Sequence, residues 1–423
     1  QRQMCIRDRV NTLKLRASYG SLGNQNIDNW YQTYSTVAYN SVAGAWLQGG
    51  KKTNITAAPG LVSAALGWEK VESYDVGLDW GAFNNRLTGS FDYYVRNTKD
   101  MVGPAPELPA LLGTDVPKTN NTDLRTTGWE LQIGWRDHLE NGLNYGVTFN
   151  VSDAQAKVTR YPNNPTGSLS SYIENRKVGE IWGYETIGIA KTNDEMNQHL
   201  ATLPNGGQSQ LGDKWAAGDI MYKDLDGDGK ISNGSNTLAD HGDLKVIGNK
   251  TPRYLFGLDL TASWKGFDFR AFMQGVMKRD YSDAKEFLFG TTDSGVWWAA
   301  GITGVQDYFR DSETWSVKNG YESENLNAYL PRPQYSGKNI QPQTRYLLNA
   351  AYLRMKNLQI GYTLPQSLVS KAGLGNVRFF VSAENLFTIT DLPSQFDPET
   401  IDTDYGNGYP LSRTFSFGVN VTL

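Results

Sequence analysis

A run of alternating aspartates, DLDGDGKISNGS (224–235), has the residue types and spacing that suit metal chemistry. Three carboxylates occupy positions one, three and five of a calcium-binding loop: Asp224, Asp226 and Asp228. Gly229 would supply the sharp turn, and the carbonyl of Lys230 would be the next ligand. Position twelve holds Ser235 in place of the bidentate Glu. The spacing predicts an incomplete site for a structural Ca²⁺ ion, and the alternative is an Asp/Gly turn in a solvated loop.

Aromatic residues in a long polar stretch form a second candidate site. The residues are Trp297, Trp298, Tyr308 and Trp315. Such rings could stack on substrate or contact a partner protein that covers it. They could also pack with one another, because a large loop needs a small core of its own. The sequence alone leaves both interpretations open.

The histidines do not lie in an enzyme motif. The chain has only three of them, His138, His199 and His241, and no GxSxG, HExxH or CxxC sequence stands near them. We therefore expect no catalytic residues and no enzymatic activity.

Strands must carry these loops, and the last eleven residues, RTFSFGVNVTL (413–423), indicate their kind. Every second residue is apolar: Phe415, Phe417, Val419, Val421 and Leu423. The residues between them are polar or small. Alternation over roughly ten residues predicts a strand long enough to cross the hydrocarbon layer at a tilt.

Other segments repeat this alternation along the chain. They lie at 13–19, 74–80, 87–95, 128–135, 143–151, 254–264, 267–273, 358–364 and 377–387. Charged residues such as Asp79, Glu130 and Arg270 fall on the polar phase. A Lys or Arg on the lipid face costs about 2–4 kcal/mol near the midplane, so this phase relation favours membrane strands.

The connections between these segments alternate in length. Short connections lie at 81–86, 136–142, 265–266 and 365–376, and long polar ones at 20–70, 97–124, 154–252, 278–349 and 389–412. In bacterial barrels the short turns are periplasmic and the long loops are extracellular. The chain is therefore predicted to be all-β, an antiparallel transmembrane β-barrel. Because an open edge in lipid is costly, we expect about ten strands of a larger barrel.

Composition agrees with this architecture. Hydrophobic residues make up 39% of the chain and the net charge is −4, which gives no basic footprint for nucleic acid. The longest apolar run is shorter than the about 18 residues that a membrane helix needs. The single cysteine, Cys5, excludes a disulfide framework. It lies in QRQMCIRDR (1–9), which we interpret as a non-native leader before the barrel portion, 10–423. The alternative to a transmembrane barrel is a secreted or surface glycan-binding β protein without transport activity.

Five collinear blocks carry a family resemblance. They lie at 67–101, 218–232, 246–275, 352–365 and 377–390. They resemble the SusC/RagA-type TonB-dependent outer-membrane transporters of Bacteroidetes. The resemblance implies the C-terminal part of a barrel with roughly 22 strands. The signal peptide, plug and TonB box of the family have no match, and we expect them to be missing here.

The resemblance also implies function and partners. It implies multi-pass localisation in the bacterial outer membrane and import of oligosaccharides or peptides, driven through TonB by way of the missing N-terminal region. A SusD-like surface lipoprotein would act as a lid. The family has an acidic residue just before VIGN (246–249). Here that residue is Asp243, displaced by an insertion that contains Asp240, and it becomes a further candidate metal ligand.

Overall fold

The structure is a computed structural model of the chain. It describes residues 9–25, 34–35, 37, 47–52, 56, 61–63, 66–104, 116–282, 288–289, 306–402 and 408–423. Two sets of predicted residues lie outside this description. They are Cys5 with most of the leader at 1–9, and the pair Trp297 and Trp298.

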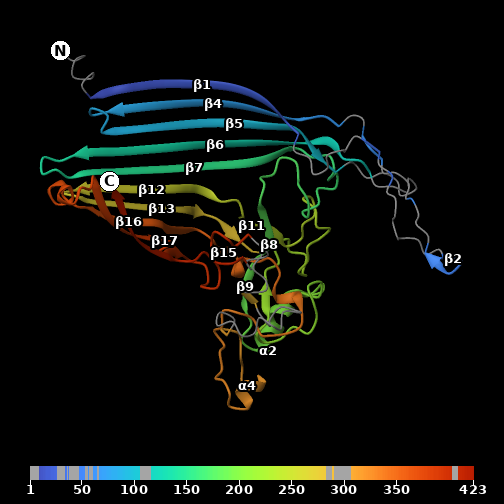
Figure 1. Cartoon of the computed structure of the whole chain (residues 1–423). Helices are drawn as coiled ribbons and strands as arrows, with labels where there is room; N and C mark the ends of the chain where they lie inside the picture. The colour runs from blue at the N-terminus through green and yellow to red at the C-terminus, as the bar shows by residue number, and fades with distance from the viewer. Residues whose placement is uncertain are drawn as a thin grey trace.

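One large antiparallel sheet dominates the described residues. Its path is β1 (Val10–Asn24), β4 (Glu69–Ala82), β5 (Leu87–Gly103), β6 (Thr119–His138), β7 (Asn144–Arg160), β12 (Arg253–Trp264), β13 (Phe267–Lys278), β16 (Tyr352–Thr363), β17 (Asn376–Glu384) and β19 (Thr414–Thr422). The short β18 (Thr388–Thr390) also pairs with β16. The strands form a curved wall with tight turns at one end (Figure 1). Each predicted strand is present, and neighbours along the chain pair side by side.

The pairing register places the alternating residues in rows across the sheet. One apolar row runs through five strands: Ala262, Phe269, Ile360, Val381 and Phe417. The adjacent row is polar: Thr261, Arg270, Gln359, Ser382 and Ser416. Apolar side chains on the first face stay exposed within the chain, and that of Phe417 is 71% exposed. The predicted phase of the strands is confirmed, because a slip of one residue would exchange these rows.

Several strands extend beyond their predicted ends. β5 continues to Gly103, β6 begins at Thr119, and β7 continues to Arg160. Most of the extra residues of β5 and β6 are polar on both phases, and in β7 the alternating apolar residues Ala154, Ala156 and Val158 are small, so hydrophobic alternation did not mark these ends. Backbone pairing nevertheless continues, with irregular register near Met101. The long connections are correspondingly shorter than predicted.

The short connections are tight turns. Between β12 and β13 only Lys265 and Gly266 intervene, with φ of 49° and 89°. Positive φ at both central residues is the geometry that matches the twist of a two-residue hairpin. The connection after β16 is longer and contains α5 (Gln366–Val369) and η7 (Ser370–Ala372). The predicted segregation of short and long connections is confirmed.

The long connections after β7, β13 and β17 fold together beyond the other end of the sheet (Figure 1). Their elements are β8 (Glu180–Tyr184), β9 (Thr186–Ile189), α2 (Asn193–Ala201), β10 (Ile220–Tyr222), β11 (Leu244–Asn249), β14 (Asp280–Tyr281), α4 (Trp315–Lys318), η5 (Gly337–Asn339), η6 (Thr344–Tyr346) and β15 (Leu348–Asn349). A small hairpin, β2 (Leu47–Gln48) with β3 (Lys51–Lys52), follows β1. None of the helices in the described ranges is long and apolar enough to span a membrane.

These three connections share one hydrophobic core, which we call the loop core. It includes Ile220, Tyr222, Leu330, Tyr346 and Ile401, each nearly or fully buried. β8 pairs with β11 and β9 with β10, so the connection after β7 builds its own small sheets. The loops are therefore packed structure, able to hold side chains in fixed positions.

Candidate metal centre and loop aromatic residues

The predicted calcium loop begins directly after β10. Asp224 accepts hydrogen bonds from the backbone N–H groups of Gly227 at 2.6 Å and Gly229 at 3.0 Å. Gly229 has a φ of 80°, which confirms the sharp turn predicted there. Asp226 accepts the N–H of Asp228 at 3.1 Å. These bonds fold the loop tightly around the Asp224 carboxylate, whereas Asp226 is exposed.

Asp243, just before β11, completes a group of three carboxylates. Its side chain is fully buried and accepts the N–H groups of Leu225 at 2.6 Å and Ser232 at 2.7 Å. One oxygen each of Asp224, Asp226 and Asp243 lies within 4.8 Å of the others. Burial raises the pKa of Asp243, and the charges of Asp226 and Asp224 raise it further. Among the described residues these three carboxylates form no ion pair. A bound cation would therefore reduce the repulsion among their negative charges.

Two predicted ligands are arranged differently from this group. The Asp228 carboxylate pairs with the Lys230 ammonium at 3.1 Å and accepts the Lys230 N–H at 3.1 Å. It is therefore not part of the group of three. A ligand role for the Lys230 carbonyl stays a prediction.

The oxygen donor set fits a hard cation. Ca²⁺ takes roughly six to eight oxygen ligands and tolerates irregular geometry. Three carboxylates supply the charge, and backbone carbonyls and water would have to supply the remaining oxygens. An acidic loop can also be held by its own N–H groups alone, as the bonds to Asp224 show.

The predicted aromatic residues divide into two kinds. Tyr308 donates its hydroxyl to Glu322 at 2.7 Å and packs against the loop core, with Arg310 over its ring. Trp315 is 70% exposed and stacks on Tyr321, their centroids 5.4 Å apart. Tyr308 is thus a loop-packing residue, whereas Trp315 at the start of α4 and Tyr321 just after it offer an exposed aromatic surface.

A second fully buried carboxylate in the loops, that of Asp219, has no signal in the sequence. Asp219 is fully buried and accepts hydrogen bonds from Arg332 and Lys338 at 2.8 and 2.9 Å, and from Asn339 at 3.0 Å. Burial by itself raises the pKa of Asp219, but these hydrogen bonds outweigh it and hold that pKa below its ordinary value. The partners lie more than a hundred residues away in the chain, so no local spacing could reveal them.

Comparison with known proteins identifies the group to which this architecture is similar. No family model matches the chain. The TonB-dependent receptor P3 of Formosa agariphila is 30% identical over 437 residues, which cover 97% of this chain and 39% of that receptor. The TonB-dependent receptor SusC of Bacteroides thetaiotaomicron is 24% identical over 430 residues, covering 97% and 38%. The resemblance to SusC-type receptors is confirmed.

A solved structure agrees with this resemblance. The RagAB peptide transporter matches with a TM-score of 0.69 at 23% identity, covering 98% of this chain and 41% of that chain. The predicted all-β outer-membrane fold and the outer-membrane localisation of a SusC-type receptor are thereby confirmed. The SusC-type relatives are receptors and transporters rather than enzymes, and they give no support to the alternative of a secreted glycan-binding protein. The chain spans only about two fifths of the length of these proteins.

Proposed function

We propose that this chain is the part of an outer-membrane importer that supplies barrel wall and outer loops for TonB-dependent uptake of oligosaccharides or peptides. The observation that carries the proposal is the match to SusC-type receptors over 97% of the chain. The packed loop core supports it, because a substrate site needs side chains held in place by rigid surroundings.

Uptake by the whole receptor tests the import function. The receptor is produced in the outer membrane of cells with and without TonB, and uptake of fluorescent oligosaccharides and peptides too large for porins is measured. We expect accumulation of at least one substrate class only where TonB is present. Equal accumulation without TonB, or none of either class, would contradict energised import.

We also propose that a SusD-like lipoprotein covers the outer loops and contacts the stacked pair of Trp315 and Tyr321. Exposed aromatic residues supply much of the energy of protein interfaces. Replacing Trp315 with Ala is expected to reduce recovery of the lipoprotein with the purified receptor. Tyr335→Ala is the matched control, because Tyr335 is 87% exposed and has no stacking partner among the described residues. Equal recovery with both variants would contradict this contact.

A third proposal is a structural Ca²⁺ ion held by Asp224, Asp226 and Asp243. The Lys230 carbonyl would be a further ligand, and Asp228 would join only if it left the Lys230 ammonium. The buried carboxylate of Asp243 beside two others supports this proposal. The ion would supply positive charge that ties the loop after β10 to the start of β11.

Calcium binding can be measured directly on the purified receptor. Asp243→Asn removes one charge from the group and is expected to weaken the affinity for Ca²⁺ roughly tenfold or more, because affinity follows the number of charged ligands. Asp240→Asn is the matched control, since Asp240 bonds to Ser235 in the same loop and lies outside the group. Wild-type affinity in Asp243→Asn, measured by calorimetry after chelation, would rule out the site.

A further inference from the structure

A hollow of about 380 Å³ lies where the connection after β7 folds back along that strand. The backbone there pairs with the end of β7: Val158 N donates to the Arg176 carbonyl at 3.0 Å and Val178 N to the Ala156 carbonyl at 2.9 Å. β8 forms the opposite side and contributes Glu180 and Trp182. The hollow is therefore bounded by paired backbone on two sides.

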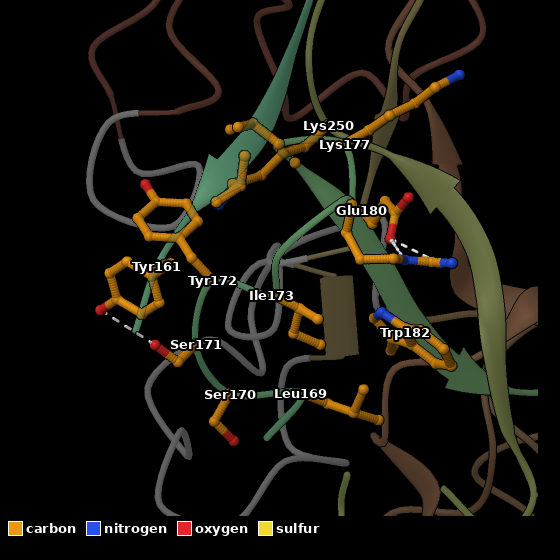
Figure 2. Close-up of a pocket in the computed structure, with 14 residues that line it drawn as sticks. Tyr161, Leu169, Ser170, Ser171, Tyr172, Ile173, Lys177, Glu180, Trp182 and Lys250 are labelled. Atoms are coloured by element: carbon orange, nitrogen blue, oxygen red, sulfur yellow. Dashed lines mark hydrogen bonds and ion pairs between the residues drawn. The ribbon is translucent and has the colours of Figure 1, made fainter. Parts of the chain in front are cut away.

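Aromatic rings stand at both sides of the hollow. Figure 2 shows Tyr161 and Tyr172 on one side and Trp182 on the other. Tyr172 is 51% exposed, and the ring of Tyr161 meets it edge-on with centroids 5.6 Å apart. Trp182 is partly buried against the loop core, with Arg176 over its ring. Tyr172 is thus an exposed ring held in a fixed orientation.

The charges that line the hollow do not cancel. Arg176 and Glu180 pair with each other at 2.7 Å. That leaves the ammonium groups of Lys177 and Lys250, both exposed, and neither has an acidic partner in the described part of the chain. Glu174 lies in the neighbouring hollow, where its carboxylate accepts the N–H of Tyr161. Two cations without an acidic partner, in a lining that also carries an exposed ring, suit a ligand that combines a flat face with negative charge.

The backbone of the hollow favours a ligand other than an extended peptide. Peptides commonly bind by adding a strand to free N–H and carbonyl groups. Here the groups of 156–158 and 175–178 that face each other are already paired. Recognition must therefore come from rings, ammonium groups and the exposed hydroxyls of Ser170 and Ser171.

We propose that this hollow is a binding subsite for an acidic oligosaccharide, with a sugar ring stacked on Tyr172 and carboxylates paired with Lys177 and Lys250. The inference rests on the proposed import function and narrows its substrate class to anionic glycans. The ligand carries its own negative charge, so its affinity falls as salt rises.

Equilibrium binding to the whole receptor in detergent tests the subsite. Trigalacturonate is the probe, maltotriose is a neutral sugar of the same length, and triglutamate is an acidic peptide. We expect trigalacturonate to bind most tightly. The double variant K177Q/K250Q and the variant Y172A should each weaken it roughly tenfold. K371Q/K265Q and Y335A are matched controls at exposed positions away from the hollow and should bind as the wild type does.

Several outcomes would overturn the proposal. They are absence of trigalacturonate binding, equal binding of maltotriose or triglutamate, and wild-type affinity in K177Q/K250Q. Binding in detergent needs no TonB, so the two proposals fail separately. Tight, lysine-dependent binding without uptake would contradict import alone, whereas uptake with lysine-independent binding would contradict the subsite alone.

Discussion

Asp219 joins two loop segments that are far apart in the chain. Its buried carboxylate accepts hydrogen bonds from Arg332 and Lys338, and the Lys338 side chain is itself only 2% exposed. Removing one member of a buried pair leaves the other charge uncompensated, and this is more costly than the net gain of forming the pair. The residue therefore fixes the segment 332–339 against β10.

Replacing Asp219 with Asn should destabilise this contact by about 3 kcal/mol, because Lys338 would remain buried without its counter-charge. Hydrogen exchange of the amides at 216–222 and 332–339 measures the local opening. Glu324→Gln is the control, since Glu324 is exposed and forms no hydrogen bond or ion pair with this network among the described residues. Unchanged protection in Asp219→Asn would show that the charge is not needed.

Acid should have the same effect as this substitution. The pKa of Asp219 is lowered in the folded chain, so its stabilisation is complete above the ordinary value of 3.8 and is lost as pH falls through the lowered pKa. Exchange rates corrected for their intrinsic pH dependence should rise over that window in the wild type. The rise should be smaller in Asp219→Asn, and equal rises in both would assign the acid sensitivity to other groups.

At the scale of the strand, ion pairs on the polar face cross a glycine on the strand between them. Arg378 of β17 reaches Asp268 of β13 at 2.5 Å, and the pair lies over Gly361 of β16. In the same way Arg16 of β1 reaches Asp92 of β5 at 2.8 Å over Gly77 of β4. Only a residue without a side chain lets each ion pair cross the middle strand.

Replacing Gly361 with Leu should displace this ion pair and destabilise the sheet by about 1–3 kcal/mol, the usual cost of overpacking. A Cβ there would meet Oδ1 of Asp268 at 2.5 Å. Gly20→Leu in β1 is the control, because a Cβ at that position meets nothing within 4 Å. Urea unfolding in micelles measures the difference, and equal stability of both variants would contradict the crossing geometry.

At the scale of the whole molecule, the outward rows define a lipid face. Phe417 and Val381 pair across β19 and β17, and Ser416 pairs with Ser382 on the other face. Membrane strands place apolar side chains toward lipid and polar ones toward the lumen. In the outer membrane this apolar face contacts lipid.

Phe417→Lys should therefore reduce insertion of the whole receptor into lipid vesicles, at a cost of about 2–4 kcal/mol if the site lies near the midplane. Ser416→Lys on the opposite face should insert nearly as well as the wild type. Nitroxide labels at the same two positions give a second measurement. The label at 417 should collide with lipid-soluble oxygen and the label at 416 with a water-soluble nickel complex. A label at 417 packed inside protein would contradict a lipid face.

The alternation of apolar and polar residues is enough to predict where the strands lie, their phase and the separation of short turns from long loops. Hydrophobic alternation is a local property with a period of two, because every second side chain of a membrane strand faces lipid and must be apolar. The rows through Phe417 and Ser416 show this alternation. Segments polar on both phases, such as the end of β5 at Gly103, carry no such signal and were missed.

Which loop residues meet depends on how the whole chain folds. Local spacing predicted Asp224 and Asp226, whereas the fold left out Asp228 and brought in Asp243, which the family resemblance had suggested. The Asp219 network and the hollow at Tyr172 have no sequence signature. The Asp219 network joins segments more than a hundred residues apart, and the hollow forms where 158–182 folds back along β7 beside Lys250. Such contacts depend on the shape and burial of the folded chain rather than on any repeat along it.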